Sequence, residues 1–295
     1  MCLVGLALGA DARFPVVIAS NRDEYFKRPT APLSWWSATA GEAPVLGGRD
    51  LDAGGTWLGL SAQGRFALLT NVRSPVPADA QAPSRGGIVP EWLGAQEPMG
   101  RFWMRTALAG HNGFNLIAAD LPRGECFWAS NATAHPQRLL PGIYGLSNAG
   151  LDTPWPKVDA LKLRLRASLA ETKSVDDLAL RLFAALADRA VAPDHALPST
   201  GVAIEWERRL SAAFIGTPDR AYGTRCSTLV ITEYRSDQAV THVMERSFDA
   251  DGHAAPVQHT VLRDWPGAYK VRDISMCAIP ASWNTGPRGT KPARA

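Results

Sequence analysis

The chain has 295 residues with 46% hydrophobic and 20% charged residues, ordinary values for a globular protein that argue against a disordered or fibrous chain. The net charge of +3 is small and the basic residues are dispersed, so nucleic acid is not an expected partner. The apolar first ten residues are too few to span a bilayer and lack the basic start of a secretory signal. We therefore predict no integral membrane segment and expect a cytoplasmic protein.

The N-terminal third is predicted to form a β-sheet. Runs of apolar and β-branched residues predict strands over 2–9, 14–20, 56–61 and 66–72. Clusters of turn-forming residues separate them, and the glycine pairs within 47–55 are predicted to form tight turns. Further along, we expect a short helix within 83–94, a hairpin over 114–120 and 125–130, and an extended segment over 138–148.

From Trp155 the apolar spacing changes to three and four residues, which predicts an amphipathic helix over 154–171. A second helix is predicted over 174–188, where Ser174 followed three residues later by Asp177 is typical of a helix start. Two packed helices are therefore expected in the middle of the chain.

The C-terminal part returns to strand character after a short helix expected within 204–214. Strands are predicted over 225–234 and 240–248. The order of sheet, helices and sheet predicts one α+β domain over 1–282, and the Gly- and Pro-rich stretch 283–295 is predicted to be a disordered tail.

Metal and disulfide chemistry are not indicated by the sequence. The cysteines Cys2, Cys126, Cys226 and Cys277 are far apart, with no CxxC spacing, and the six histidines show no paired-ligand spacing. We expect neither a disulfide framework nor a bound metal, and the sequence predicts no cofactor.

Polar residues stand at the ends of the predicted strands. They are Cys2, the cluster from Asn21 to Glu24, Asn71, Asn148 and Arg225. If the polar ends of these strands lie together, the side chains converge on a single pocket, which would be a candidate active site.

The chemistry of that candidate site follows from Cys2. A methionine before a small second residue is a good substrate for removal, and the free α-amine of a terminal cysteine is able to accept the proton of its own thiol. Asp23 is a candidate for orienting that amine, and the amides of Asn71 and Asn148 are candidate oxyanion donors. Arg225 is a candidate for the positive charge that lowers the thiol pKa.

Several motifs in order carry a resemblance to a known family. They are MC at the start, ASNRDE, GGTWLGLS, TNVRSP, YGLSN and YGTRCST. Together they resemble the NRDE family, which includes the Transport and Golgi organization 2 proteins, over a stretch that ends near Trp265. That family is similar in turn to the N-terminal-nucleophile hydrolases, most closely their choloylglycine hydrolase and penicillin acylase-like branch. The resemblance implies a four-layer αββα sandwich with the nucleophile on the first strand.

The resemblance also assigns roles to individual residues. In that branch an Arg-Asn-x-Asp stretch ends the second strand; its Asn and Asp match Asn21 and Asp23, while its Arg position falls on Ser20. This departure leaves Arg22 and Arg225 as alternatives for the thiol-activating charge. The later asparagines of the branch match Asn71 and Asn148, and its distal arginine matches Arg225.

Strand alternation adds a constraint on the NRDE stretch. Asn21 and Asp23 share one face of an extended strand, and Arg22 and Glu24 share the other. We expect Asn21 and Asp23 to face the site and Arg22 to brace the strand end. Trp57 is a candidate either for lining a substrate pocket or for packing in the core.

Two functions follow as hypotheses. The first is a cysteine N-terminal-nucleophile hydrolase or acyltransferase that acts on a small-molecule substrate, a nonpeptide amide or an acyl ester or thioester. The second is a non-catalytic carrier or trafficking protein of the same fold for haem or acyl lipids such as acyl-CoA. The complete set of candidate catalytic residues favours the first, and Ser20 in place of the arginine favours the second.

Overall fold

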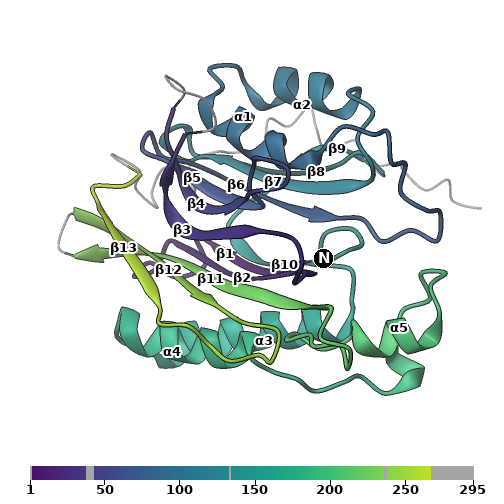
Figure 1. The fold of residues 1–295 in the computed structure, drawn as a ribbon. Coiled ribbons are helices and arrows are strands. Elements are labelled where there is room, and N and C mark those ends of the chain that lie inside the picture. The colour runs from purple at the N-terminus through teal and green to yellow at the C-terminus, as the bar shows by residue number, and fades with distance from the viewer. Residues whose placement is uncertain (1, 38–42, 133, 236–237, 267–295) are drawn as a thin grey trace, which may run out of the picture.

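Two antiparallel β-sheets face each other, and helices lie on the outer side of each sheet (Figure 1). The computed structural model describes residues 2–37, 43–132, 134–235 and 238–266; the predicted tail over 283–295 lies outside this range. The predicted α+β class is confirmed. Within the described residues, each helix is too short or too polar to cross a membrane.

The first sheet, called sheet A, brings the start of the chain beside segments from its C-terminal half. Every neighbouring pair in it is antiparallel. In spatial order its strands are β10 (Gly142–Leu146), β1 (Cys2–Leu8), β2 (Val16–Tyr25), β11 (Tyr222–Arg235), β12 (Gln238–Ser247) and β13 (Gln258–Arg263).

The second sheet, called sheet B, follows the order of the sequence, so each strand pairs with the next one along the chain. Its strands are β3 (Thr30–Trp36), β4 (Val45–Asp50), β5 (Leu58–Ser61), β6 (Arg65–Asn71), β7 (Phe114–Asp120), β8 (Glu125–Ser130) and β9 (Ala134–Arg138).

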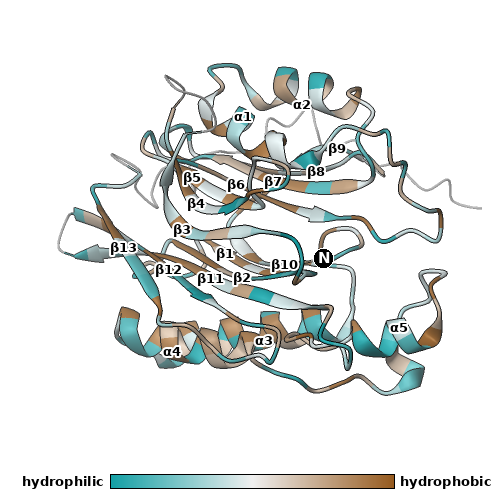
Figure 2. Cartoon of the chain, in the orientation of Figure 1, coloured by the Kyte–Doolittle hydropathy of each residue, from teal (hydrophilic) through white to brown (hydrophobic). Residues whose placement is uncertain are grey.

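The helices are α1 (Ile88–Gly94), α2 (Met99–Ala107), α3 (Pro156–Glu171), α4 (Val175–Leu186) and α5 (Ile204–Arg209). Apolar residues of α3 and α4 pack on the outer face of sheet A, and those of α1 and α2 pack on sheet B. A third apolar cluster joins the inner faces of the two sheets, and Figure 2 shows hydrophobic residues on the strands and helices that form these layers. The predicted start of α4 is confirmed, because the Ser174 side chain accepts a hydrogen bond from Asp177 N at 3.2 Å.

Strand alternation in β1 and β2 decides which residues face the space between the sheets. In β1, Val4 and Leu6 belong to the core between the sheets, whereas Leu3 packs against the helix layer. Cys2 has the parity of Val4, so its side chain faces the space between the sheets. In β2 the same rule turns Arg22 inward and Asn21 toward the helices.

Some elements differ from the sequence-based predictions. The stretch around Gly47 and Gly48, predicted to be a turn, belongs to strand β4, where an added Cβ on Gly47 would lie 2.4 Å from Leu58 O of the neighbouring strand. Glycine is therefore required there by close strand packing rather than by a turn. Helix α2 was also missed, because its first turn contains a glycine and its apolar face is short.

A close backbone approach between the segment after β4 and the turn before α1 gives a testable prediction. A Cβ on Gly55 would lie 1.9 Å from Gly86 O, so Gly55→Ala should lower the free energy of unfolding by about 1–3 kcal/mol. Gly100→Ala in helix α2 is the matched control, because an added Cβ meets nothing within 4 Å; it should stabilise the protein by up to about 1 kcal/mol. Chemical denaturation of both variants checks this, and equal stability of the two would contradict the predicted clash.

Candidate functional site

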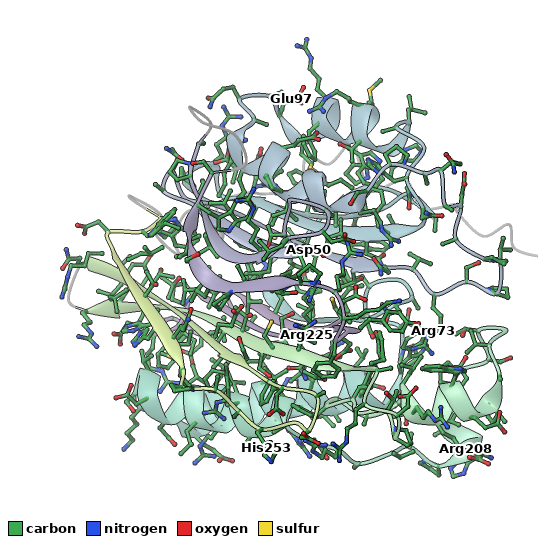
Figure 3. All side chains as sticks on the ribbon, in the orientation of Figure 1. Asp50, Arg73, Glu97, Arg208, Arg225 and His253 are labelled. Atoms are coloured by element: carbon green, nitrogen blue, oxygen red, sulfur yellow. The ribbon has the colours of Figure 1, made fainter. Side chains whose placement is uncertain are left out.

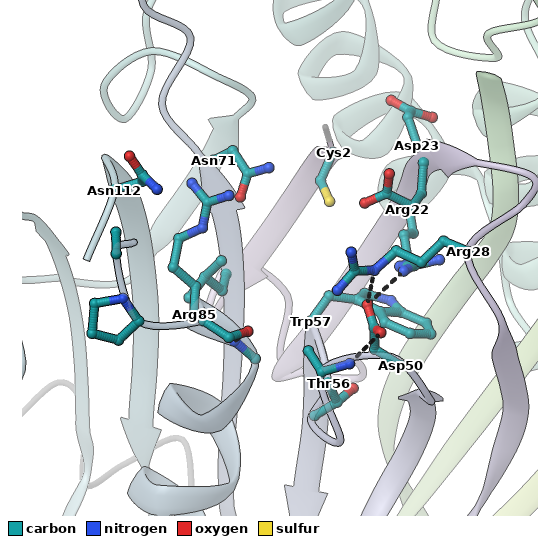
Figure 4. A pocket seen from close by; sticks show the side chains of 17 residues that line it. Cys2, Arg22, Asp23, Arg28, Asp50, Thr56, Trp57, Asn71, Arg85 and Asn112 are labelled. Atoms are coloured by element: carbon teal, nitrogen blue, oxygen red, sulfur yellow. Dashed lines mark hydrogen bonds and ion pairs between the residues drawn. The ribbon is translucent and has the colours of Figure 1, made fainter. Parts of the chain in front are cut away.

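A pocket of about 330 Å³ lies where β1 begins and where β2, β4 and β6 end. Figure 4 shows the Cys2 thiol directed into it, with Arg22, Asp23 and Arg28 on one side and Asn71 and Arg85 on the other. Strands of both sheets therefore contribute to one site. Its lining is rich in charged and amide side chains, which distinguishes it from the apolar cores.

Cys2 is the first residue of β1 and pairs with Arg22 of β2. Its side chain lines the pocket although only 8% of the residue is exposed. Burial raises the pKa of the Cys2 thiol, and the negative charge of Asp23 also raises it, whereas the charge of Arg22 lowers it. The thiol is therefore placed to react but requires a base to become a thiolate near neutral pH.

Arg22 is held on the inner face of β2 by three contacts, one of which is a hydrogen bond from its Nη1 to Thr30 Oγ1 at 3.2 Å. Its guanidinium stacks 4.4 Å from the Trp57 ring centroid, and its Nη2 donates to Asp50 at 3.1 Å. Asp50 also accepts from Arg28 Nε at 2.6 Å, so one carboxylate serves two arginines. The structure thus places Arg22 against the pocket, whereas we expected Asn21 to face it and Arg22 to brace the strand end. Trp57 lines the pocket as well, beneath Arg22.

Asp23 reaches the pocket from the opposite face of β2. It lies one residue beyond the pairing of Cys2 with Arg22, so β1 no longer flanks it. The pairing of β2 with β11 also has an irregularity between Thr224 and Cys226, which bends the strands at this point. Thr224 Oγ1 donates to Asp23 at 2.7 Å. Arg22 and Asp23 therefore both line the pocket. In a straight strand these neighbouring side chains would point to opposite faces, so only one of them would reach it.

A buried ammonium interacts electrostatically with Asp23. Lys157 of α3 is 5% exposed, and its Nζ donates to Leu210 O at 2.8 Å. Burial lowers the pKa of Lys157 to about 8, while the charge of Asp23 acts in the opposite direction. Burial raises the pKa of Asp23, and the charge of Lys157 opposes that rise. The two groups partly compensate each other's loss of hydration.

The two predicted oxyanion donors are hydrogen-bonded neighbours, but only Asn71 lines the pocket. Asn71 lines the pocket at the end of β6. Asn148 is 1% exposed and is not among the described residues that line the pocket; its Nδ2 donates to Asn71 O at 2.8 Å. Its neighbour Ser147 donates from Oγ to Cys2 O at 2.9 Å. Asn148 therefore supports the backbone that carries Asn71, and Ser147 supports that of Cys2.

Asn21 and Arg225 lie outside the pocket lining in the described part of the chain. Asn21 Nδ2 donates to Leu186 O at 2.9 Å and Ala213 O at 2.8 Å, so Asn21 ties β2 to the helix layer. Arg225 lies on β11 of sheet A, where Figure 3 labels it, and its Nη1 donates to Tyr25 O and Arg28 O at 2.9 Å each. These contacts hold the segment that follows β2.

Sequence reasoning missed several residues that line or support the pocket: Arg28, Asp50, Arg85, Asn112 and Lys157. Arg28 and Asp50 had a signal, because Arg28 follows the end of β2 and Asp50 is the last residue of β4. Arg85 and Lys157 had none, because they come from a distant loop and from a helix whose other residues fit ordinary amphipathic packing.

A second cluster of potential ligands lies far from the pocket on the surface. Asp249, Asp251 and His253 have oxygen or nitrogen atoms within 4.8 Å of one another, and all three are exposed. Asp249 accepts hydrogen bonds from the backbone N–H groups of the other two residues, at 2.9 and 2.8 Å. The arrangement is explained by the turn itself.

Comparison with known proteins places this chain in a family. Residues 1–250 match the family described as Transport and Golgi organisation 2. The chain belongs to this family. It is 33% identical to the Transport and Golgi organization protein 2 homolog of Bos taurus, an alignment that covers 87% of this chain and 90% of that protein. It is 32% identical to the Homo sapiens homolog, with 81% and 88% covered. The predicted family resemblance is confirmed.

Among solved structures, the chain is similar to a conjugated bile acid hydrolase from Clostridium perfringens, studied as its C2A mutant. The identity is 9%, the match covers 88% of this chain and 96% of that chain, and the TM-score is 0.41.

The buried ammonium gives a prediction about pH. The pKa of Lys157 is about 8 in the folded protein against 10.5 for an ordinary lysine, so between these pH values the unfolded chain binds the proton and the folded chain does not. This group therefore makes the folded state more stable as pH rises from about 8 toward 10.5. The difference in free energy of unfolding, wild type minus Lys157→Met, should increase over that window. Denaturation at pH 7 to 10 measures it, and a constant difference would show that Lys157 is an ordinary lysine.

Proposed function

We propose that this protein is a cysteine N-terminal-nucleophile hydrolase or acyltransferase that acts on a nonpeptide amide or an acyl ester or thioester. The observation that carries the proposal is the position of the Cys2 thiol, at the first residue of β1 and in one pocket with Asp23, Arg22 and Asn71. The two facing sheets with helices outside them support the further proposal that the fold is the four-layer αββα sandwich of that class.

The proposed reaction begins with removal of Met1, which frees the α-amine of Cys2. The amine takes the thiol proton, and Sγ forms a bond to the substrate's acyl carbon. The Asn71 side chain donates a hydrogen bond to the substrate's carbonyl oxygen as that oxygen becomes negative. Asn148 holds the Asn71 backbone in position through its hydrogen bond to Asn71 O. The bond to the leaving nitrogen, oxygen or sulfur breaks as that atom takes the proton from the amine. Water or an acceptor nucleophile then cleaves the resulting acyl-thioester and restores the thiol.

The base is essential to this proposal because the thiol is buried. With its pKa raised by burial, Cys2 on its own has a low thiolate fraction at neutral pH. An α-amine has an ordinary pKa of about 7.7–8.0 and accepts a proton in that range. Asp23, on the neighbouring strand, is the residue proposed to orient it. A carrier for haem or acyl lipids, the alternative on the same fold, needs neither the free amine nor a reactive thiol.

The first test concerns the chain start and the thiol. Intact mass should show the loss of one methionine, because an acylated nitrogen has no usable lone pair for the proton of Cys2. Iodoacetamide at neutral pH should alkylate Cys2 at least about tenfold faster than Cys126 or Cys226, since both are buried in apolar cores and burial raises the pKa of Cys126 to about 12. Retention of Met1 together with equal rates at the three thiols would favour the carrier.

A second test separates orientation of the amine from simple electrostatics. The charge of Asp23 raises the pKa of Cys2, so if charge were its whole effect, Asp23→Asn would speed alkylation. If Asp23 orients the α-amine, Asp23→Asn should slow alkylation about tenfold at pH 7, within the usual contribution of a positioned general base. The readout is the pH profile of the Cys2 alkylation rate.

Asp50→Asn is the matched control for this test. It removes a carboxylate of the same pocket and leaves Arg22 and Arg28 less neutralised, so it should keep or raise the rate while lowering thermal stability. A faster rate in Asp23→Asn, as in the control, would remove Asp23 from the proposed mechanism.

A further inference from the structure

Arg85 differs from the other two arginines of the pocket in its partners. Arg22 and Arg28 both bind Asp50. Arg85 lies across the pocket from Cys2 (Figure 4), and within the described residues no carboxylate comes within ion-pair distance of it. Its Nη1 donates to Gly113 O at 3.0 Å, which fixes one arm of the guanidinium and leaves the rest of the fork for a ligand.

The backbone that carries Arg85 is held firmly in place. Arg85 opens the 3₁₀ turn Arg85–Gly87, where Gly86 N donates to Ser84 Oγ at 3.2 Å. Thr56 N donates to Gly86 O at 3.1 Å, and the backbones at Gly55 and Gly86 are too close for a Cβ between them. A guanidinium held on a rigid loop loses little entropy when it binds an anion, so the position is preorganised for recognition.

The acidic residues of the pocket do not neutralise Arg85 directly. Asp50 is shared between Arg22 and Arg28, and Asp23 receives a hydrogen bond from Thr224 on the far side of Cys2. Glu24 also lines the pocket, and its Oε1 accepts from Tyr25 N at 2.8 Å. Burial lowers the pKa of Arg85, the charge of Glu24 acts in the opposite direction without an ion pair, and arginine remains a cation at any physiological pH. A partly dehydrated cation therefore faces the thiol across the pocket.

We propose that Arg85 binds an anionic group of the substrate, a carboxylate or a phosphate, and so selects small acyl compounds that carry such a group near the bond to be cleaved. This inference rests on the proposed function, because it takes Cys2 as the reacting group. A guanidinium fork matches the two oxygens of a carboxylate or phosphate and discriminates against a neutral amide of the same size. Arg85 is then a specificity-determining residue that positions the substrate toward Cys2.

The first arm of the test measures anion binding without any reaction. The Tm of the wild-type protein is measured alone, with millimolar succinate and with millimolar inorganic phosphate. A ligand that binds the folded state raises the Tm. We expect at least one anion to raise Tm, and the more effective one identifies carboxylate or phosphate. Arg85→Gln should lose that rise, and Arg85→Lys, which keeps the charge without the fork, should retain part of it.

The second arm measures whether the anion lies toward Cys2. Iodoacetate and iodoacetamide differ in charge but react with the same thiol, so the ratio of their alkylation rates at Cys2 reports recognition of the carboxylate separately from the thiol pKa. Arg85→Gln should lower this ratio about tenfold, the effect of one charge-assisted hydrogen bond in a partly buried site. Arg105→Gln is the control for net charge, because Arg105 is 55% exposed on α2 and pairs with Glu91 and Glu97.

The outcomes separate this inference from the proposed function. If neither anion raises the Tm of the wild-type protein, or if Arg85→Gln keeps the full rise and an unchanged alkylation ratio, the inference is overturned. If Cys2 reacts no faster than Cys126, the proposed function fails even where Arg85 binds an anion. A loss of both effects in Arg85→Gln, with Arg105→Gln unchanged, supports the inference.

Discussion

The pairing of β1 with β2 is the constraint on which the site depends. Cys2 pairs with Arg22, and the following residues of β1 pair in unbroken register down to Leu8 with Val16. This register is fixed by burial on both faces, since Leu6 packs between the sheets and Leu3 packs against the helices. A slip of one residue would exchange the two faces and turn the Cys2 side chain toward α3 instead of the pocket. The apolar residues of β1 therefore determine where its first side chain points.

The second sheet completes the site through a short segment after β10. Thr70 Oγ1 donates to Ser147 O at 2.6 Å, and Asn148 Nδ2 donates to Asn71 O at 2.8 Å, so this segment joins the end of β6 to sheet A. Ser147 also donates to Cys2 O. Because these groups are buried, loss of one partner would leave another polar group without a hydrogen bond. The distance between the two sides of the pocket is thus set by buried hydrogen bonds.

Much of the fold and part of the site were predictable from the sequence, and the failures have physical causes. Apolar periodicity located the strands around Leu6 and Leu68 and the helices α3 and α4, because burial on one or both faces leaves a direct record in the sequence. The faces of Asn21 and Arg22 could not be predicted, since periodicity does not say which face of β2 meets the other sheet. Arg85 could not be predicted either, because a distant loop brings it to the pocket.

The three described cysteines show why residue type alone does not determine reactivity. All are buried, and burial raises the pKa of each thiol. Cys126 and Cys226 lie in the apolar core between the sheets, where a thiol is a small hydrophobic side chain. Cys2 is also buried, but it stands at the end of that core, where a pocket gives small molecules access to its thiol. A nucleophilic side chain in this fold must lie where the core meets the pocket, because only there does substrate reach it. Cys2 is the only residue of β1 that lies at this position.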